Sequence, residues 1–304
     1  MSDVVVIAHR GASGERPEHT LESYRLAIEQ GADYIEPDLV MTRDGVLIAR
    51  HENEIGGTTD VANHPEFAAR RRVQIIEGET MTGWFTEDFT LAEIKGLRAR
   101  ERLPALRPRN CAFDGRFSVP TFDEILQLVT ETNGRRSTGP RIGVYPETKH
   151  PAHFAAIGLP QEQAVLTALE SFDYGREGSP VFIQSFDPNN LRQLRGMTHL
   201  PLVQLLEHEL GDLQRIAEYA DGIGIAKALA SAEGVAEAHS LDLTVHVWTF
   251  RAENEFLPAD LKIGDAPAEH GDLDGEIERY LSRGIDGFFT DFPAIGVRVR
   301  NSHS

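Results

Sequence analysis

Short runs rich in β-branched residues alternate with amphipathic, helix-length segments along nearly the whole chain. Eight such runs occur, at residues 4–8, 34–41, 142–147, 181–186, 201–206, 222–226, 243–250 and 287–292. Helix-like stretches lie between most of them, at residues 20–30, 121–132, 161–171, 188–195, 213–220 and 228–240. This alternation predicts a parallel sheet, and eight strands in 304 residues fit a closed TIM (β/α)8 barrel. A doubly wound open sheet is the alternative, but no Gly-x-Gly-x-x-Gly motif follows the first run.

Two segments break the alternation. Residues 46–50 follow a tight-turn signal, Asp44-Gly45, and are predicted to form the return arm of a hairpin that brings His51 back beside residues 36–38. Residues 52–118 are too long for a simple connection and are predicted to form a small subdomain over one barrel mouth. We therefore expect one domain, residues 1–304, with an insertion at 52–118.

Two further features, one in residues 52–118 and one in a second insertion at residues 253–276, have alternative interpretations. Trp84, Phe85 and Phe89 could line a substrate entrance or pack as the insertion's own core. Residues 253–276 hold eight acidic residues and one lysine, which favours a solvated loop.

Composition excludes several classes of protein. The net charge of −18 argues against a nucleic-acid groove, although one metal ion could still create a site for a small phosphorylated substrate. No run approaches 18 uncharged apolar residues, so no integral membrane contact is expected. Cys111 is the only cysteine, so no internal disulfide can form. No secretory signal precedes the first strand, and a cytoplasmic location is expected. The oligomeric state stays open.

Charged and imidazole side chains stand where several predicted strands end. His9 and Arg10 follow the first run, where His9 is suited to proton transfer and Arg10 to holding a phosphate oxygen. Glu36 and Asp38, two positions apart, share one face of the second strand. Such a pair is costly inside a barrel unless it faces a lysine or binds a metal, and oxygen ligands favour Mg²⁺ or Ca²⁺.

A third strand end carries Glu147 and Lys149, which again share a face. Because a closed barrel brings strand ends together, these residues are predicted to converge with those of the first two strands in a metal and phosphate site. His246 and Trp248 share a face further along, and Trp248 could stack on a ligand or belong to the core. Asp291, after the last strand, is expected to contact the site residues rather than the substrate. Other polar strand-end residues are Gln184 and Ser185.

Several motifs resemble the glycerophosphodiester phosphodiesterase family. They are HRGA at 9–12, PEHTLESY at 17–24, GADYIEPDL at 31–39, TRDGVLIARHE at 42–52, PETK at 146–149, IQSF at 183–186, VWT at 247–249 and DGFFTDFP at 286–293. The similarity covers nearly the whole chain. It implies a TIM barrel with a small insertion after the second-strand hairpin, at the place of residues 52–118.

The resemblance also implies roles for individual residues. His9 and His51 would be the acid–base pair, and Glu52 stands where many members have aspartate. One divalent cation, Mg²⁺ or Ca²⁺, would be held by three carboxylates: Glu36, Asp38 and Glu147. Arg10 and Lys149 would contact the phosphate, and Trp248 the glycerol side of the substrate.

The expected reaction is metal-dependent hydrolysis of a small glycerophosphodiester to glycerol 3-phosphate and an alcohol through a cyclic phosphate. The identity of the alcohol, the choice of metal and the assignment of base and acid stay open. The alternatives are a phospholipase of the phosphatidylinositol or sphingomyelinase D type, a non-catalytic phosphodiester-binding protein, and a metal-dependent barrel lyase or isomerase acting on a sugar acid.

Overall fold

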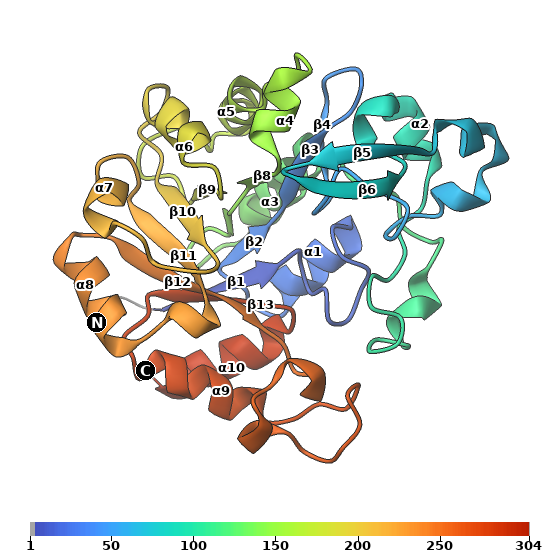
Figure 1. Cartoon of the computed structure of the whole chain (residues 1–304). Coiled ribbons are helices and arrows are strands. Elements are labelled where there is room, and N and C mark those ends of the chain that lie inside the picture. Colours follow the sequence, from blue (N-terminus) through green and yellow to red (C-terminus); the bar gives the residue numbers. More distant parts are fainter. Residues whose placement is uncertain (1–3, 304) are drawn as a thin grey trace.

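A closed ring of parallel strands forms the centre of the molecule (Figure 1). The computed structural model describes residues 4–303. In chain order the ring strands are β1 (Val5–His9), β2 (Tyr34–Glu36), β3 (Asp38–Met41), β7 (Gly143–Val144), β8 (Glu147–Thr148), β9 (Ile183–Ser185), β10 (Leu202–Leu206), β11 (Gly222–Ala226), β12 (Thr244–Phe250) and β13 (Gly287–Thr290). β2 and β3 are one strand interrupted at Pro37, which has no N–H to donate, and β7 and β8 are one strand interrupted at residues 145–146.

Strand pairing closes the ring. β1 pairs in parallel with both β13 and β2, β2 pairs with β7, and β3 pairs with β8. From β8 the pairing continues through β9, β10, β11 and β12 to β13. The predicted eight-stranded TIM-type barrel is confirmed, and the open-sheet alternative is wrong.

Helices pack around the outside of the ring (Figure 1). They are α1 (Leu21–Glu29), α3 (Phe122–Arg135), α4 (Pro151–Ala156), α5 (Glu162–Ser171), α6 (Pro188–Arg195), α7 (Leu213–Ala217), α8 (Ala232–Ser240), α9 (Leu273–Leu281) and α10 (Pro293–His303). Side-chain caps fix where several begin: Thr20 caps α1, and Thr121 with Glu124 forms a capping box on α3. No helix within residues 4–303 has the length and apolar character needed to cross a bilayer.

The apolar core has two parts. The larger lies between strands and helices, and a smaller cluster of Ile7, Tyr145, Val203 and Phe289 fills the inside of the barrel. Ile7, Tyr145 and Phe289 each stand two positions before a polar residue at a strand end, so they share a face with it. The barrel is therefore filled by apolar side chains beneath a polar mouth.

The predicted hairpin after the second strand is present. β4 (Leu47–Ala49) pairs antiparallel with β3, with Met41 opposite Leu47. The chain then runs through residues 52–118, which contain the antiparallel pair β5 (Arg72–Ile76) and β6 (Glu79–Gly83), helix α2 (Leu91–Gly96) and the 3₁₀ turns Val61–Asn63, Pro65–Arg70, Thr86–Asp88 and Asn110–Phe113. The β5–β6 pair was not predicted.

The aromatic residues of this segment pack inside it. Phe85 and Phe89 are fully buried, Phe89 stacks edge-on against Phe67, and Trp84 donates its indole N–H to the Phe67 carbonyl at 2.8 Å. These three predicted aromatics belong to the segment's core, and none of them lines the cavity at the barrel mouth.

The charge of residues 253–276 favoured a solvated loop, but the structure agrees only in part. Its two end residues, Glu253 and Glu276, are buried and paired with Arg107 and Lys227 respectively. The remainder contains the 3₁₀ turns Asn254–Phe256 and Ala259–Leu261 and the start of α9. The two end residues are buried because they form ion pairs with distant residues, which the local composition does not indicate.

Candidate active site

The residues expected at the site meet in one small cavity at the carboxyl ends of the strands. The cavity has a volume of about 100 Å³. All eight predicted site residues line it: His9, Arg10, Glu36, Asp38, His51, Glu147, Lys149 and Trp248. The remaining lining residues are Gln184, Phe186, Leu205, Thr249, Arg251 and Phe289. Residues up to 280 positions apart in the chain are thus brought together by barrel closure.

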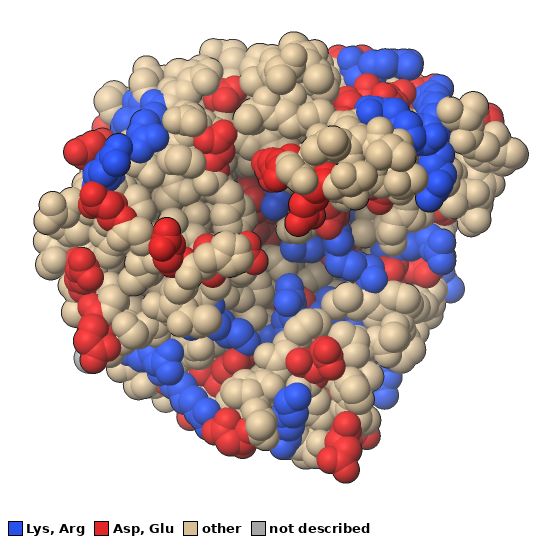
Figure 2. Space-filling model, viewed as in Figure 1, with Lys and Arg blue, Asp and Glu red and all other residues tan. Residues whose placement is uncertain are grey.

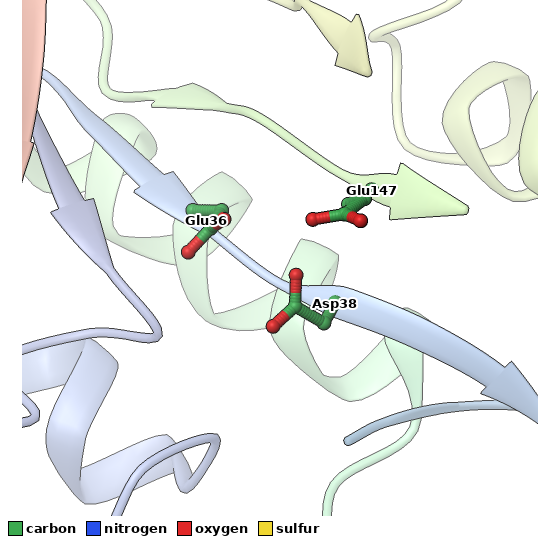
Figure 3. Close-up of side chains that lie close together, drawn as sticks. All are labelled: Glu36, Asp38 and Glu147. Atoms are coloured by element: carbon green, nitrogen blue, oxygen red, sulfur yellow. The ribbon is translucent and has the colours of Figure 1, made fainter. Parts of the chain in front are cut away.

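Glu36, Asp38 and Glu147 form a buried cluster that we call the acidic trio (Figure 3). Each offers a carboxylate oxygen, and these oxygens all lie within 4.8 Å of one another. Strand register produces this arrangement, because Glu36 ends β2 and Asp38 pairs directly with Glu147 across β3 and β8. In Figure 3 the three carboxylates point toward a shared space.

The trio is only partly neutralised by neighbouring groups. Glu147 pairs with Lys149 at 2.8 Å, and Glu36 accepts hydrogen bonds from Gln184 Nε2 at 3.0 Å and from the Arg10 backbone N–H at 2.8 Å. Asp38 Oδ2 accepts from His19 Nε2 at 2.9 Å, with Arg10 Nε at 3.4 Å.

Electrostatic repulsion within the trio is visible in its acid–base properties. Burial and the charges of Asp38 and Glu147 raise the pKa of Glu36 well above its usual value. Burial, together with Asp38, raises the pKa of Glu147 to about 8 despite Lys149. Burial opposes ionisation of Asp38, but the hydrogen bond and charge of His19 hold the pKa of this carboxyl low.

The trio fits a divalent cation. Asp38 Oδ1 is buried and has no hydrogen-bond partner among residues 4–303, which is costly for a carboxylate oxygen without a ligand. Three buried oxygen donors are the kind that Mg²⁺ and Ca²⁺ take. A cation bound there would offset the repulsion that raises the pKa of Glu36 and Glu147.

Arg10 and Gly11 depend on an unusual backbone. Arg10 is left-handed, with φ of 58°, and this directs its N–H at Glu36. Gly11 follows with φ of 87°, and a Cβ there would lie 2.4 Å from Ser23 Oγ and 2.7 Å from the Ser23 carbonyl carbon. Only glycine fits this close approach, which places Arg10 beside the trio.

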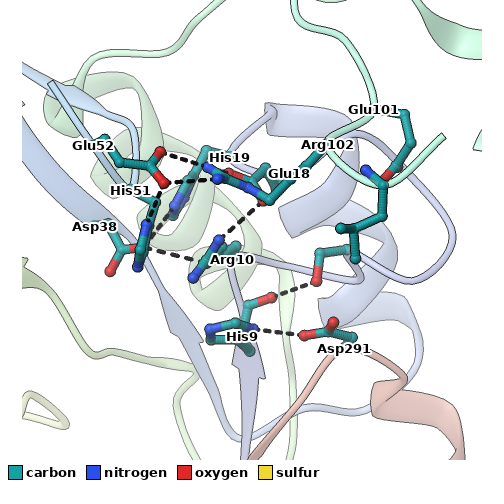
Figure 4. Close-up of polar contacts among 12 residues, drawn as sticks. His9, Arg10, Glu18, His19, Asp38, His51, Glu52, Glu101, Arg102 and Asp291 are labelled. Atoms are coloured by element: carbon teal, nitrogen blue, oxygen red, sulfur yellow. Dashed lines mark hydrogen bonds and ion pairs between the residues drawn. The ribbon is translucent and has the colours of Figure 1, made fainter. Parts of the chain in front are cut away.

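Each site histidine is held by a carboxylate through Nδ1 (Figure 4). His9 Nδ1 lies 2.6 Å from Asp291 Oδ1, and His51 Nδ1 lies 2.9 Å from Glu52 Oε1. Because a carboxylate accepts, Nδ1 carries the proton and Nε2 is the free lone pair. Burial, with the charge of Arg10, lowers the pKa of His9 to about 4, so its imidazole is neutral at pH 7.

The two histidine–carboxylate pairs differ in exposure. The side chains of His9 and Asp291 are 9% and 3% exposed, whereas those of His51 and Glu52 are 32% and 25% exposed. His51 therefore faces the open side of the mouth, next to a wider groove of about 700 Å³ that also contacts Ile76 and Met81 of the β5–β6 pair.

Trp248 is one of the residues that line both the cavity and this groove. Its indole N–H donates to the Gly224 carbonyl at 3.0 Å, and its ring stands edge-on to Phe186 at 5.9 Å. The indole is thus fixed in place with part of its surface open to a ligand.

Positive side chains gather on one side of the hollow although the molecule is strongly acidic overall. Figure 2 shows Lys and Arg side chains gathered beside the central hollow of this face, in a chain of net charge −18. Lys149 stays charged there, because Glu147 and Asp38 raise its pKa against the opposing effect of burial. This local field favours an anionic substrate.

Several supporting residues were not predicted from the sequence. They are Glu18 and His19 after the first strand, and Arg102 and Arg107 in the insertion. Glu18 and His19 lie within the PEHTLESY motif, and His19 contacts Asp38 directly. No local pattern distinguishes Arg102 or Arg107 from other arginines of the segment.

Comparison with known proteins agrees with this geometry. A profile of the Glycerophosphoryl diester phosphodiesterase family matches residues 9–295. The glycerophosphodiester phosphodiesterase GDPD6 of Arabidopsis thaliana is 36% identical over 94% of this chain and 83% of its own. That of Haemophilus influenzae is 30% identical over 97% of this chain and 89% of its own.

Solved structures show the same fold. An Oleispira antarctica phosphodiesterase in complex with the product sn-glycerol-3-phosphate superposes with a TM-score of 0.70 at 20% identity, covering 98% of this chain and 96% of that one. The Thermotoga maritima glycerophosphodiester phosphodiesterase gives a TM-score of 0.59 at 19% identity, covering 97% and 98%. With the family profile spanning nearly its whole length, this chain belongs to the glycerophosphoryl diester phosphodiesterase family, a family of phosphoric diester hydrolases.

Proposed function

We propose that this protein is a metal-dependent glycerophosphodiester phosphodiesterase that releases glycerol 3-phosphate and an alcohol. One observation carries the proposal: two imidazoles, three buried carboxylates and two cationic side chains line the same cavity. The Oleispira antarctica relative was solved with glycerol 3-phosphate, which supports this product. We treat residues 1–304 as one catalytic domain that carries the insertion at 52–118.

Binding relies on charge. The acidic trio would hold one Mg²⁺ or Ca²⁺, which when bound supplies Lewis-acid stabilisation of a phosphate oxygen. Arg10 and Lys149 donate hydrogen bonds to the non-bridging oxygens, and their charge offsets the negative charge that develops as phosphorus is attacked. Trp248 contacts the glycerol carbons, and the groove beyond it receives the alcohol.

Proton transfer falls to His9 and His51. One imidazole removes the proton of the glycerol hydroxyl beside the ester through Nε2, and this oxygen forms a new bond to phosphorus. The other imidazole, protonated on binding the anionic substrate, gives its proton to the departing alcohol as the P–O bond breaks. Water then opens the cyclic phosphate with the two roles exchanged, which leaves glycerol 3-phosphate and returns both imidazoles to their starting state.

The test is release of glycerol 3-phosphate from a panel of diesters with choline, ethanolamine, glycerol and inositol as the alcohol. We expect release that EDTA abolishes and that Mg²⁺ or Ca²⁺ restores. His51→Asn serves as the matched inactive control. Absence of release from every diester, with both metals supplied and the protein folded, would overturn the proposal.

The same experiment separates the competing functions. Binding of a diester without product would indicate a non-catalytic binding protein. Release of phosphorylated headgroup from intact phospholipid vesicles, with co-sedimentation, would indicate a phospholipase. No specific contact in the structure favours either of these over the small soluble diester.

A further inference from the structure

Two arginines of the insertion contact the carboxylates that hold the two site histidines. Arg107 Nη2 lies 2.5 Å from Asp291 Oδ2, whose other oxygen binds His9. Arg102 binds both oxygens of Glu52 at 2.7 Å, and Glu52 Oε1 also binds His51. The two arginines stand only five positions apart in the sequence.

Each arginine is fixed by further contacts. Arg107 Nε lies 2.5 Å from Glu253 Oε1, and its Nη1 donates to the Ser13 carbonyl at 3.0 Å. Arg102 also binds both oxygens of Glu18 at 2.7 Å. Glu18 in turn accepts from Arg10 at 3.1 Å, which links Arg102 to the phosphate-binding side (Figure 4).

The segment that carries the two arginines is held in shape by contacts on either side of them. Asn110 Nδ2 donates to Glu101 Oε2 at 2.9 Å and to the Ser13 carbonyl at 3.2 Å. Glu101 also accepts from the Leu103 N–H at 2.8 Å. The segment is thus tied to the loop after β1, so its arginines cannot shift independently of the barrel.

We propose that Arg102 and Arg107 are positioning residues that together set the orientation and the tautomer of both catalytic imidazoles. This rests on the proposed function. Each guanidinium keeps its carboxylate charged and aimed at Nδ1–H, so that Nε2 faces the substrate. One short segment of the insertion therefore fixes both proton-transfer groups, which lie on different parts of the barrel.

The roles of the two arginines can be tested independently by single substitutions. Arg107→Gln removes the guanidinium behind Asp291 and leaves the Arg102 contacts intact, whereas Arg102→Gln does the reverse. We expect kcat to fall about 10- to 100-fold in each, the usual cost of removing such a supporting contact. For Arg107→Gln we expect KM to change less than threefold, because Arg107 does not line the cavity.

The decisive readout is the imidazole itself. ¹⁵N NMR of the metal-free protein, with resonances assigned from His9→Asn and His51→Asn, should show Nδ1–H in both rings of the wild type. Arg107→Gln should give a mixture of tautomers at His9 only, and Arg102→Gln at His51 only. Arg109→Gln, an exposed neighbour on the same segment, should change neither kcat nor tautomer.

A purely structural role gives a different result. If thermal unfolding shifts but both tautomers and kcat are retained, or if kcat falls while both rings keep Nδ1–H, the proposal is wrong. Should Arg107→Gln fail to fold, Arg107→Lys, which keeps the charge but not the fork, should fold with kcat between wild type and the histidine variants. If the wild type proves inactive, the proposed function fails, whereas the tautomer measurement still tests the positioning role.

Discussion

Two sets of carboxylates lie side by side at the barrel mouth and differ in what balances their charge. The acidic trio shares Lys149 and Arg10, and the pKa of two of its members is raised. A second set, which we call the paired carboxylates, consists of Glu18, Glu52 and Asp291. Each of these contacts an arginine of the insertion. Arginine charges outweigh burial and lower the pKa of Glu18 and Asp291, whereas the hydrogen bond from His51, followed by that from Arg102, lowers the pKa of Glu52.

The difference shows that a carboxylate at this mouth is suited either to bind a cation or to hold another side chain, depending on whether a positive side chain already balances its charge. The paired carboxylates are already neutralised and serve to hold other side chains. The negative charge of the trio is only partly balanced, and Asp38 Oδ1 has no hydrogen-bond partner among the described residues. Substitutions in the two sets should therefore have opposite effects on stability.

The largest effect is expected in the trio. Glu36→Gln should lower kcat/KM by about 10³-fold, because a cation at this site supplies several kcal/mol of transition-state stabilisation. In EDTA the same variant should unfold at a higher temperature than the wild type, because the amide cannot ionise, whereas burial and the neighbouring carboxylates make the charged form of Glu36 costly. Both are measured by glycerol 3-phosphate release and calorimetry, and a lower unfolding temperature in EDTA would contradict our reading of the trio.

Neutralising one of the paired carboxylates is expected to lower the stability of the protein, opposite to the effect in the trio. Asp291→Asn leaves Arg107 and Arg251 facing a neutral amide, and the loss of one partner from a buried ion pair costs about 3 kcal/mol. Urea unfolding in EDTA measures this change in the free energy of unfolding. A stability equal to that of the wild type would remove the contrast between the two sets.

The next effect tests whether the paired carboxylates act only through their histidines. His9→Asn and His51→Asn should each lower kcat at least about 100-fold, as expected for loss of an acid–base group. The double variant of His9→Asn with Asp291→Asn should be no slower than His9→Asn alone. A further large loss in the double variant would give Asp291 a role of its own.

The smallest effect concerns a buried histidine that has no carboxylate of residues 4–303 within hydrogen-bond distance. His246 Nδ1 bonds to the Tyr145 hydroxyl at 2.8 Å, and burial lowers the pKa of His246 to about 4, against the attraction of Asp286. Between pH 4 and about 6.5 the unfolded chain binds the extra proton, so stability rises with pH across this window and levels off above it.

His246→Gln should reduce that slope by up to one proton, about 1.4 kcal/mol per pH unit. Urea unfolding at a series of pH values measures it, and an unchanged slope would contradict a neutral His246. Unlike the two carboxylate sets, His246 should affect activity little, because it does not line the cavity.

The sequence predicted the barrel and the lining of its mouth because both depend on local patterns. β-branched runs locate the strands, and the spacing of two places Glu36 with Asp38 and Glu147 with Lys149 on shared faces. The roles of these residues remain predictions.

What the sequence could not indicate depends on contacts between distant segments. Arg107 and Asp291 stand 184 positions apart, and nothing near either residue signals the pair. The buried ends of the acidic segment could not be predicted either, because Glu253 pairs with Arg107, which stands 146 positions away. Ion pairs of this kind follow from the tertiary fold and cannot be read from composition.

Because a side chain has no room at Gly11, few substitutions at this position should give an active protein. A library randomised at Gly11 and at Gly45 should give unequal outcomes under selection for activity. Both glycines have positive φ, but a Cβ at Gly45 meets nothing within 4 Å, whereas at Gly11 it would collide with Ser23. Asparagine and aspartate should therefore survive at position 45, while glycine alone should be recovered at position 11.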